Sequence, residues 1–546
     1  MQILVGDRWT DGFADLARSA TQVRIEVLAL HNLERLAGLY PVRPRDLRMV
    51  WSYAKEIGPR DTLRKVVSRT SERFRNMKYL SCGFGRVIEA PLHGRHAVGD
   101  PVVFIDPIGP ACAERVVLPE VLLRSVDPAS LPEFASLDDD SILHQGVGGD
   151  ADPWWAPLRG WHPESGTELS PLGVSVALKD AFRTLSELDW SNARKLPRSA
   201  GTANTVLRPS VERKRRVGKK SAVLFGYGNY AKTIILPRVA PHLDVERVHE
   251  IDPTQIPLSR RDGFVWDTSP RLGADERPDA VIIAGYHHSH ASLAAEALRR
   301  GAATVIEKPL ATTRAQLRGL LSAMRGSDAP VFSGFQRRYL PFNNMARGDL
   351  GVHPGDPISY HAVVFEVPLP SLHWYRWPNS QSRLLSNGCH WLDHFLYLNE
   401  WAAVSDYDLM ASPDGQLNCS VVLENGAFMS MVLTDQGSRR LGVRDHVELR
   451  AGSTTVTIED CSRYRSENAS RVLRKKSMNR LDAYRVMYDV IGKRIAASDS
   501  GDSMLSVQRS TGLALDLEDR LRSLSRPTLG AGTVPVASSR VFAVAN

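Results

Sequence analysis

An alternation of strand and helix patterns between residues 221 and 333 constrains the fold of this chain more than any other feature. It opens with the apolar run SAVLF, which is followed directly by a glycine turn, a helical stretch and a second strand pattern. A further strand, loop, helix and strand follow one another between residues 278 and 311. Such alternation is typical of a parallel sheet with helices on both faces. The sequence therefore predicts a doubly wound α/β domain over residues 221–333.

The glycine turn GYGNYA, residues 226–231, has the chemistry of a phosphate-binding loop. Gly226 permits a tight turn, and Gly228 lets the backbone approach a pyrophosphate that sits on the N-terminus of the following helix. Glu250 ends the next strand pattern, where an acid accepts hydrogen bonds from ribose hydroxyls and repels a 2′-phosphate. This favours NAD over NADP as the cofactor, and Asp252 is the alternative acid for the same role. A plain βαβ turn with a surface acid is the structural alternative.

The carboxyl end of the predicted sheet carries a lysine, Lys308, in the Glu-Lys-Pro sequence at residues 307–309. Ligands bind at this edge of parallel sheets, and a lysine whose pKa depends on its surroundings is suited to chemistry there. An earlier loop, after VIIAG, carries three histidines within residues 287–290. No nearby carboxylate or cysteine completes a metal site with them. We expect them to line a nicotinamide pocket or to make structural hydrogen bonds.

A helical segment after the α/β domain, SNGCHWLDHF at residues 386–395, carries a second reactive group. His390 and Asp393 are three residues apart and so lie on one face of a helix. A histidine exchanges protons near neutral pH, and a carboxylate one turn away can orient its ring. Asn387 can cap this helix. Arg337 or Arg338, in GFQRRY, can meet a substrate phosphate or carboxylate, and an inter-domain salt bridge is the alternative.

The rest of the chain divides into four segments. Residues 1–128 have short apolar runs between Gly, Pro and Asp turns, which predicts a small β-rich domain. Residues 129–220 are predicted to be a connector that ends in the basic linker VERKRRVGKK. Residues 334–525 combine alternating strand patterns with helices, which predicts an antiparallel sheet with one face buried. The tail, residues 526–546, is predicted to be mobile.

Composition limits the classes of protein to which this chain can belong. A chain of 546 residues is too long to form a single hydrophobic core, so more than one domain is expected. No apolar run is long enough to span a membrane, and no secretory signal is recognisable. Five scattered cysteines without a CxxC motif favour reduced thiols in a cytoplasmic protein without a metal site. The net charge is +8, but six basic residues crowd into residues 211–220 without aromatic neighbours. This favours a solvated linker over nucleic-acid binding.

Together these motifs resemble the Gfo/Idh/MocA family of nicotinamide-dependent oxidoreductases. The resemblance spans about residues 221–523 and rests on the glycine turn, DAVIIAGYHHSH, EKPLA, GFQRRYLPF and NGCHWLDHFLYL, in this order. It implies a Rossmann domain followed by a domain with a large, mostly antiparallel sheet that often forms a dimer surface. It also implies dehydrogenation of sugars, inositols or nucleotide sugars with NAD or NADP.

The resemblance also implies roles for individual residues. Lys308 matches the family's active-site lysine, His390 its proton-transferring histidine, and Asp393 a substrate-binding carboxylate. The family commonly places an aspartate four residues before that histidine, where this chain has Ser386. We expect Lys308 and His390 to be catalytic and to contact substrate together with Arg337, Asn387 and Asp393. The expected cofactor site consists of Gly226, Tyr227, Gly228, Asn229, Tyr230, Glu250, Gly285, His290 and Glu307.

Residues 1–128 resemble the GroES-like part of medium-chain alcohol dehydrogenases through NMKYLSCGFGRVIEA and HAVGDPVVFIDPIGPACAERVVLP. More closely, they resemble the front of bacterial two-domain oxidoreductases that fuse such a unit to a Gfo/Idh/MocA unit. This chain has neither a zinc-ligand set nor a second glycine-rich βαβ pattern between residues 130 and 220. We therefore expect a truncated remnant that serves packing, assembly or substrate access.

The leading hypothesis is a cytoplasmic NAD(P)-dependent oxidoreductase that assembles as a homodimer or homotetramer. It would transfer hydride between nicotinamide and a hydroxyl or ketone of a sugar, polyol or nucleotide sugar. Its rival is a catalytically degenerate protein that binds NAD(H) and a sugar for regulation or scaffolding, which Ser386 would suit. Association with nucleic acid through residues 211–220 is a second rival, and no membrane partner is expected.

Overall fold

The structure is a computed structural model of the 546-residue chain. It describes residues 218–250, 263–267, 271–368, 375, 380–437 and 442–524, strands and short stretches between residues 2 and 125, and two-residue strands at 194–195 and 206–207. Most of the predicted connector and the whole predicted tail lie outside the described residues. None of the helices within these ranges is both long and apolar enough to cross a membrane.

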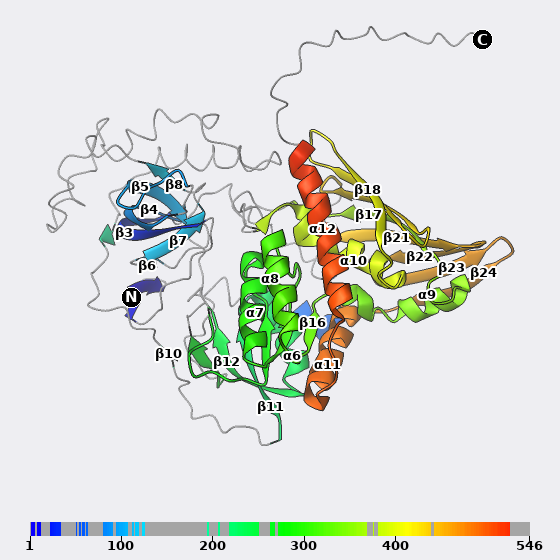
Figure 1. Cartoon of the computed structure of the whole chain (residues 1–546), viewed down its shortest axis with the longest axis horizontal. Coiled ribbons are helices and arrows are strands. Elements are labelled where there is room, and N and C mark those ends of the chain that lie inside the picture. Colours follow the sequence, from blue (N-terminus) through cyan, green and yellow to red (C-terminus); the bar gives the residue numbers. More distant parts are fainter. Residues whose placement is uncertain are drawn as a thin grey trace, which may run out of the picture.

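The α/β domain is built on a seven-stranded sheet with the order β10-β13-β12-β11-β14-β15-β16 (Figure 1). Strands β11 to β16 pair in parallel, and only β10 is antiparallel to its neighbour among these strands. The order reverses between β11 and β14, and ligands bind at such a switch point beyond the carboxyl ends of the strands. The predicted doubly wound domain is confirmed. The strands are β10 (Val206–Leu207), β11 (Lys220–Phe225), β12 (Leu243–His249), β13 (Val265–Asp267), β14 (Ala280–Ile283), β15 (Ala303–Ile306) and β16 (Val331–Ser333).

Both faces of this sheet are buried because alternate side chains of each strand point to opposite sides. Val223 and Val281 belong to one apolar core, which includes residues of α7 (His290–Arg299) and α8 (Arg314–Arg325). Leu224 and Ile282 belong to the other core, which includes η6 (Ala231–Ile235), α6 (Leu236–Val239) and α11 (Asp482–Ala497). Figure 1 shows α7 and α8 side by side, with α11 next to α6. The late helix α11 therefore packs on the α/β domain, although it comes after the strands of the second domain in sequence.

The second domain contains an eight-stranded sheet with the order β18-β19-β20-β17-β21-β22-β23-β24. Only the β17–β20 pair is parallel, so the predicted mostly antiparallel sheet is confirmed. A tight turn at residues 424–426 joins β19 to β20, with Gly426 at a φ of 87°. The strands are β17 (Ser359–Phe365), β18 (Val404–Ala411), β19 (Leu417–Leu423), β20 (Phe428–Thr434), β21 (Arg444–Ala451), β22 (Thr454–Glu459), β23 (Arg463–Asn468) and β24 (Val472–Ser477).

Helices cover one face of this sheet and supply part of the candidate site. They are α9 (Phe342–Leu350), η12 (Leu384–Gly388), α10 (Cys389–Leu398) and α12 (Met504–Leu524), which contact one another or the sheet. Nearly every residue of α10 is buried, including the two histidines and the aspartate of the HWLDH sequence. A helix that is apolar around most of its circumference lies inside a domain. The chemistry of α10 is therefore enclosed rather than displayed on the surface.

The N-terminal region is β-rich, as predicted. A six-stranded antiparallel sheet has the order β7-β3-β4-β5-β8 with β9 paired to β3, and a second sheet has the order β2-β1-β6. The assignment of this region as GroES-like stays a prediction. The strands are β1 (Gln2–Val5), β2 (Arg8–Asp11), β3 (Gln22–Leu33), β4 (Leu80–Glu89), β5 (Pro101–Asp106), β6 (Cys112–Ala113), β7 (Arg115–Pro119), β8 (Leu123–Ser125) and β9 (Arg194–Lys195).

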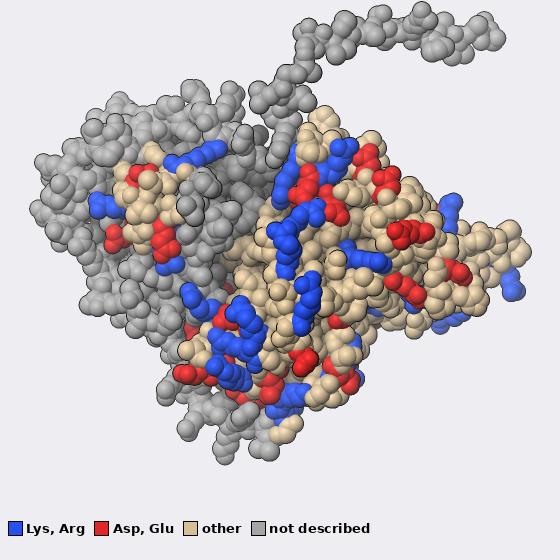
Figure 2. All heavy atoms as spheres, in the orientation of Figure 1, with Lys and Arg blue, Asp and Glu red and all other residues tan. Residues whose placement is uncertain are grey.

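Basic and acidic side chains are interspersed over the described part of the face drawn in Figure 2. Along α8 and α12, for example, Arg314 is paired with Asp516 and Asp519, and Arg520 with Asp408. Such pairing offsets the charge of Arg314 and of Arg520 locally.

Candidate functional site

The glycine turn after β11 requires its first glycine. Gly226 has a φ of 90°, and a Cβ there would lie 2.6 Å from the carbonyl oxygen of Ala284. The amide of Gly226 donates to the carbonyl oxygen of His249 at 2.8 Å, which fixes the turn between β12 and β14. A Cβ at Gly228, in contrast, would meet no described atom within 4 Å. The first glycine closes the turn, and the second leaves open space in front of a helix N-terminus, which fits a pyrophosphate.

Glu250 lies where sequence analysis expected the ribose-binding acid, directly after β12. It is buried, and its carboxylate accepts a hydrogen bond from the backbone amide of Tyr227 in the glycine turn. The same carboxylate has further lone pairs with which it can accept from hydroxyl groups. Asn229 opens the helix after the turn, and its carbonyl oxygen accepts from the Thr233 hydroxyl at 2.7 Å. The alternative acid, Asp252, lies outside the described residues.

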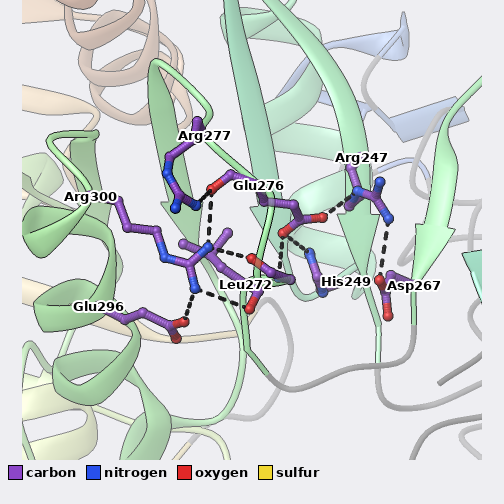
Figure 3. A network of polar contacts seen from close by, with 9 residues as sticks. Arg247, His249, Asp267, Leu272, Glu276, Arg277, Glu296 and Arg300 are labelled. Atoms are coloured by element: carbon purple, nitrogen blue, oxygen red, sulfur yellow. Dashed lines mark hydrogen bonds and ion pairs between the residues drawn. The ribbon is translucent and has the colours of Figure 1, made fainter. Parts of the chain in front are cut away.

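A network of ion pairs and hydrogen bonds fixes the carboxyl ends of β12 and β13 beside Glu250 (Figure 3). His249 lies 3.2 Å from Glu276, and its ring stacks on Phe225 with centroids 4.3 Å apart. The ligand atoms of His249, Asp267 and Glu276 all lie within 4.8 Å of one another, a spacing that could hold a metal ion. Arg247, however, forms ion pairs with both carboxylates. A guanidinium between the acids disfavours a second cation, so we interpret the cluster as support for the glycine turn.

His290 and Gly285, both expected to bind cofactor, form a structural link between two loops. The His290 ring nitrogens lie 2.9 Å from the carbonyl oxygen of Pro309 and 3.1 Å from that of Gly285. The loop after β14 is thereby tied to the loop that carries Lys308. In the same loop, burial and the neighbouring His290 lower the pKa of His288 to about 4. His290 therefore makes structural hydrogen bonds, which was one of the two roles expected for these histidines.

Glu307 and Tyr230, also expected at the cofactor, contact each other and α11. The Glu307 carboxylate accepts from the Tyr230 hydroxyl at 3.4 Å and from the hydroxyl of Tyr488 in α11. Burial raises the pKa of Glu307, although these hydrogen bonds and Lys308 oppose the shift. A Cβ at Gly334 would lie 2.7 Å from the same carboxylate, so the position is tightly enclosed. Glu307 joins the lysine loop, the glycine-turn helix and α11 at one point.

Lys308 extends from the α/β domain to the second domain. Its ammonium group donates to the backbone carbonyl oxygen of Ser386 at 3.0 Å, and it lies 5.8 Å from the centroid of the Tyr375 ring. Burial lowers the pKa of Lys308, but Tyr375, Cys389 and Glu307 together outweigh burial, and the net shift is upward. Lys308 is therefore a charged hydrogen-bond donor at neutral pH, not a base.

His390 has the opposite electrostatic character. It is 5% exposed on α10, and its Nδ1 has no hydrogen-bond partner among the described residues. Burial, Lys308 and Arg337 hold its pKa well below the ordinary value. The imidazole is therefore neutral at neutral pH and able to accept a proton. Because Lys308 bonds to Ser386 in η12, directly before α10, the fold brings it to the end of the helix on which His390 lies.

Asp393 is not free to contact a substrate. It is fully buried, and it accepts from Arg338 at 2.6 Å and 3.0 Å, while Arg338 also pairs with Asp502 at 3.0 Å. The neighbouring Arg337 donates to Asp445 at 2.6 Å, although its Nε and Nη1 have no partner among the described residues. Both arginines are buried in ion pairs, but their partners all lie within residues 334–525, so these pairs join parts of the second domain and are not the inter-domain salt bridge given as the alternative.

Asn387 is bonded to an acidic residue, Glu366, which the sequence did not identify as part of the site. Its amide donates to the carboxylate of Glu366 at 2.6 Å. Glu366 is 9% exposed and directly follows β17. Arg383 lies between Glu366, at 3.6 Å, and Asp435, at 3.5 Å. The signal in the sequence is a single acid that ends an apolar strand pattern, as Glu250 does.

Comparison with known proteins directly supports the assignment of the α/β domain as a Rossmann domain. Residues 220–335 match the sequence model of an oxidoreductase family with an NAD-binding Rossmann fold, GFO_IDH_MocA. The matched residues contain the glycine turn, Glu250 and Lys308, and the geometry of Gly226, Gly228 and Glu250 fits NAD. NAD is thus the cofactor of this Rossmann domain.

The individual proteins that this chain resembles share only a small fraction of identical residues with it. YteT of Bacillus subtilis (strain 168), an oxidoreductase by name, is 22% identical over 217 residues, which are 36% of this chain and 49% of YteT. The chain thus spans about half the length of this curated relative. A Gfo/Idh/MocA family oxidoreductase from Vibrio cholerae has a TM-score of 0.44 at 16% identity, covering 56% of this chain and 98% of its own. The WlbA dehydrogenase from Bordetella pertussis, in complex with NADH and UDP-GlcNAcA, has a TM-score of 0.46 at 15% identity, covering 56% and 97%.

Proposed function

We propose that this chain is an NAD-dependent dehydrogenase or reductase that acts on a CH–OH or C=O group of a sugar, polyol or nucleotide sugar. The observation that carries the proposal is that a charged lysine from one domain bonds to the segment just before the helix that carries a neutral, buried histidine of the other. Lys308 comes from the matched NAD-binding domain, and His390 comes from α10 in the second domain. An imidazole can accept the proton of a hydroxyl, and an ammonium can stabilise the negative charge that develops on its oxygen, while the hydride of the carbinol carbon requires a nicotinamide acceptor.

In the oxidative direction, the two residues act on the same substrate oxygen. Neutral His390 accepts the hydroxyl proton, and the Lys308 ammonium donates a hydrogen bond that stabilises the negative charge developing on the oxygen. NAD, held by the glycine turn and Glu250, would supply the nicotinamide ring that accepts a hydride from the carbinol carbon. In the reductive direction, His390 returns the proton to the oxygen. Asp393 has no part in this proposal because its carboxylate is paired with Arg338.

The electrostatics of the site suit this division of roles. One Lys308 N–H is already bonded to the Ser386 carbonyl oxygen, and an ammonium has two further N–H groups. The fold thus orients the lysine through the backbone of Ser386, where the family's aspartate side chain is missing. Burial, together with the positive charges of Lys308 and Arg337, lowers the pKa of His390 and keeps it unprotonated before substrate arrives.

A homodimer or homotetramer belongs to the proposal. Val363, Met410 and Phe428 are exposed, and the strand registers put all three on the face of the eight-stranded sheet opposite the buried one. Large apolar side chains gathered on one sheet face favour association. Sedimentation velocity of the full chain would test this, and a monomer at micromolar concentration would contradict it.

The second candidate is a protein that binds NAD(H) and a sugar without turning it over. Ser386, in place of the usual aspartate, is the specific observation that favours it. Titration of the full chain with NADH and NADPH by fluorescence, followed by a screen of polyols, sugars and nucleotide sugars at the NADH absorbance band, separates the two. We expect tighter binding of NADH than NADPH, with turnover of at least one substrate. NADH binding without turnover of any hydroxylated compound would favour the second candidate.

A matched variant tests the cofactor preference in the same titration. Glu250→Gln removes the charge that repels a 2′-phosphate while keeping the size of the side chain. We expect NADPH affinity to rise relative to NADH affinity. An unchanged ratio would show that Glu250 does not face the ribose.

A further inference from the structure

Ser386 stands where an aspartate was expected, so any carboxylate near Lys308 must come from another position in the chain. Lys308 is bonded to the backbone of Ser386, so the Ser386 position presents a carbonyl oxygen instead of a side-chain carboxylate. The next residue, Asn387, is bonded to Glu366 at 2.6 Å. Two adjacent residues of η12 thus hold the ammonium of Lys308 and the carboxylate of Glu366. A carboxylate reaches the neighbourhood of Lys308 from β17 rather than from the helix.

Glu366 is enclosed but not saturated. Asn387 donates to Oε1, and the nearest atom of Arg383 lies 3.6 Å from Oε2, beyond ordinary hydrogen-bond length. A carboxylate has about four lone-pair positions. Burial raises the pKa of Glu366, against the effects of Asn387, Arg383 and Lys308. Its remaining acceptor capacity is available to the hydroxyl groups of a ligand.

The charges around Glu366 are balanced. Lys308 and Arg383 supply two positive charges, and Glu366 and Asp435 supply two negative charges, with Arg383 lying between the acids. Arg337, the other basic residue near the site, is paired with Asp445. An anionic substrate requires cations that are not already paired, such as the arginines that grip phosphates in a bidentate manner. Arg383 and Arg337 each form an ion pair with a carboxylate, and the remaining N–H groups of Lys308 are assigned to the reacting oxygen, so the site offers a carboxylate acceptor that matches neutral hydroxyl groups.

We propose that Glu366 is a substrate-binding residue, which accepts hydrogen bonds from hydroxyls next to the reacting carbon, and that the substrate is a neutral polyol or sugar. Nucleotide sugars and sugar acids are disfavoured because their charge would face Glu366 and Asp435. This inference rests on the proposed function, since Lys308 and His390 define the reacting oxygen. The Nδ1 of His390, which has no hydrogen-bond partner within the part of the chain that the structure describes, offers a polar atom to the same neutral ligand.

Calorimetric titration of the NADH-loaded full chain tests the inference without requiring turnover. The neutral probes are myo-inositol, D-glucose and xylitol, and the charged probes are D-glucuronate and UDP-glucose. We expect a neutral probe to bind more tightly than either charged probe. In Glu366→Gln its affinity should fall roughly 10- to 100-fold, because a hydrogen bond to a charged acceptor is lost and a buried acceptor becomes a donor. NADH affinity should not change.

A matched control separates this effect from a general loss of carboxylates. Glu448→Gln removes a carboxylate from β21 that pairs with Arg450 on the same sheet, and it should leave probe binding unchanged. Three results would overturn the inference: tighter binding of a charged probe, wild-type affinity in Glu366→Gln, or no binding of any neutral probe. Failure of the proposed function is distinguishable, because it would appear as absent NADH binding or absent hydride transfer from every substrate class.

Discussion

Removal of the Lys308 ammonium group should cause the largest single loss of activity in this chain. Lys308→Met keeps the length and apolar surface of the side chain and deletes the charge that we assign to the substrate oxygen. Removing one preorganised donor from a site of developing negative charge lowers kcat by about 10²- to 10³-fold, or roughly 3–4 kcal/mol. NADH affinity should change little, because the glycine turn and Glu250 are untouched. Initial rates at the NADH absorbance band and fluorescence titration measure the two quantities.

The same variant should change the pH dependence in a direction that the structure fixes. Lys308 helps to hold the pKa of His390 below its ordinary value. His390 must be unprotonated to accept a proton, so oxidation slows as the pH falls through its pKa. Without the neighbouring cation this pKa rises, and the fall in rate should begin at a higher pH than in the wild type. A general structural defect would lower the rate without moving the acid limb.

A surface lysine provides the matched control. Lys493→Met removes a charge that pairs with Asp489 on the exposed side of α11, and it should retain wild-type rates and pH dependence. The reasoning is refuted if Lys308→Met turns over at the wild-type rate. It is refuted equally if the residual activity keeps the acid limb of the wild type.

Gly226→Ala should abolish NADH binding and lower the melting temperature, because its Cβ would meet the Ala284 carbonyl oxygen. Gly228→Ala should weaken NADH binding and leave the melting temperature unchanged. Equal effects of the two substitutions on the melting temperature would contradict the assignment of the turn. Arg338→Met should lower the free energy of unfolding by about 3–5 kcal/mol, since it leaves Asp393 buried and unpaired; a loss in urea titrations below about 1 kcal/mol, the range of exposed pairs, would contradict this. The pKa of His288 is lowered from 6.5 to about 4, so unfolding takes up a proton there between these values and stability falls as the pH falls. His288→Asn should reduce the slope of unfolding free energy against pH, near pH 5, by about 1.4 kcal/mol per pH unit; an unchanged slope would contradict it.

The α/β domain was predictable because its signals are local. Strands buried on both faces appear as continuous apolar runs, and a turn that needs a φ of 90° at Gly226 requires glycine. The edge where ligands bind then follows from the parallel order of the strands, which located Lys308 and Glu250. The mostly antiparallel second sheet was predictable for a similar reason, since its strands alternate buried and exposed residues. The GroES-like identity of the front region is still a prediction.

The partners of the site residues were not predictable, because they come from distant parts of the chain. The three-residue spacing of His390 and Asp393 correctly indicated one helix, but it could not show that Arg338 occupies the carboxylate. Nothing in the sequence around Glu307 indicated that α11 would supply a tyrosine to it. Glu366 was missed because an acid at the end of a strand looks the same whether it faces solvent or a site.

The structure of a ternary complex with NADH and a substrate or product analogue tests the central claim most directly. The account predicts that one substrate oxygen lies within about 2.6–3.2 Å of both the Lys308 ammonium and a ring nitrogen of His390, next to the nicotinamide ring. An oxygen that contacts only one of the two, or a ligand bound away from the glycine turn, would contradict it.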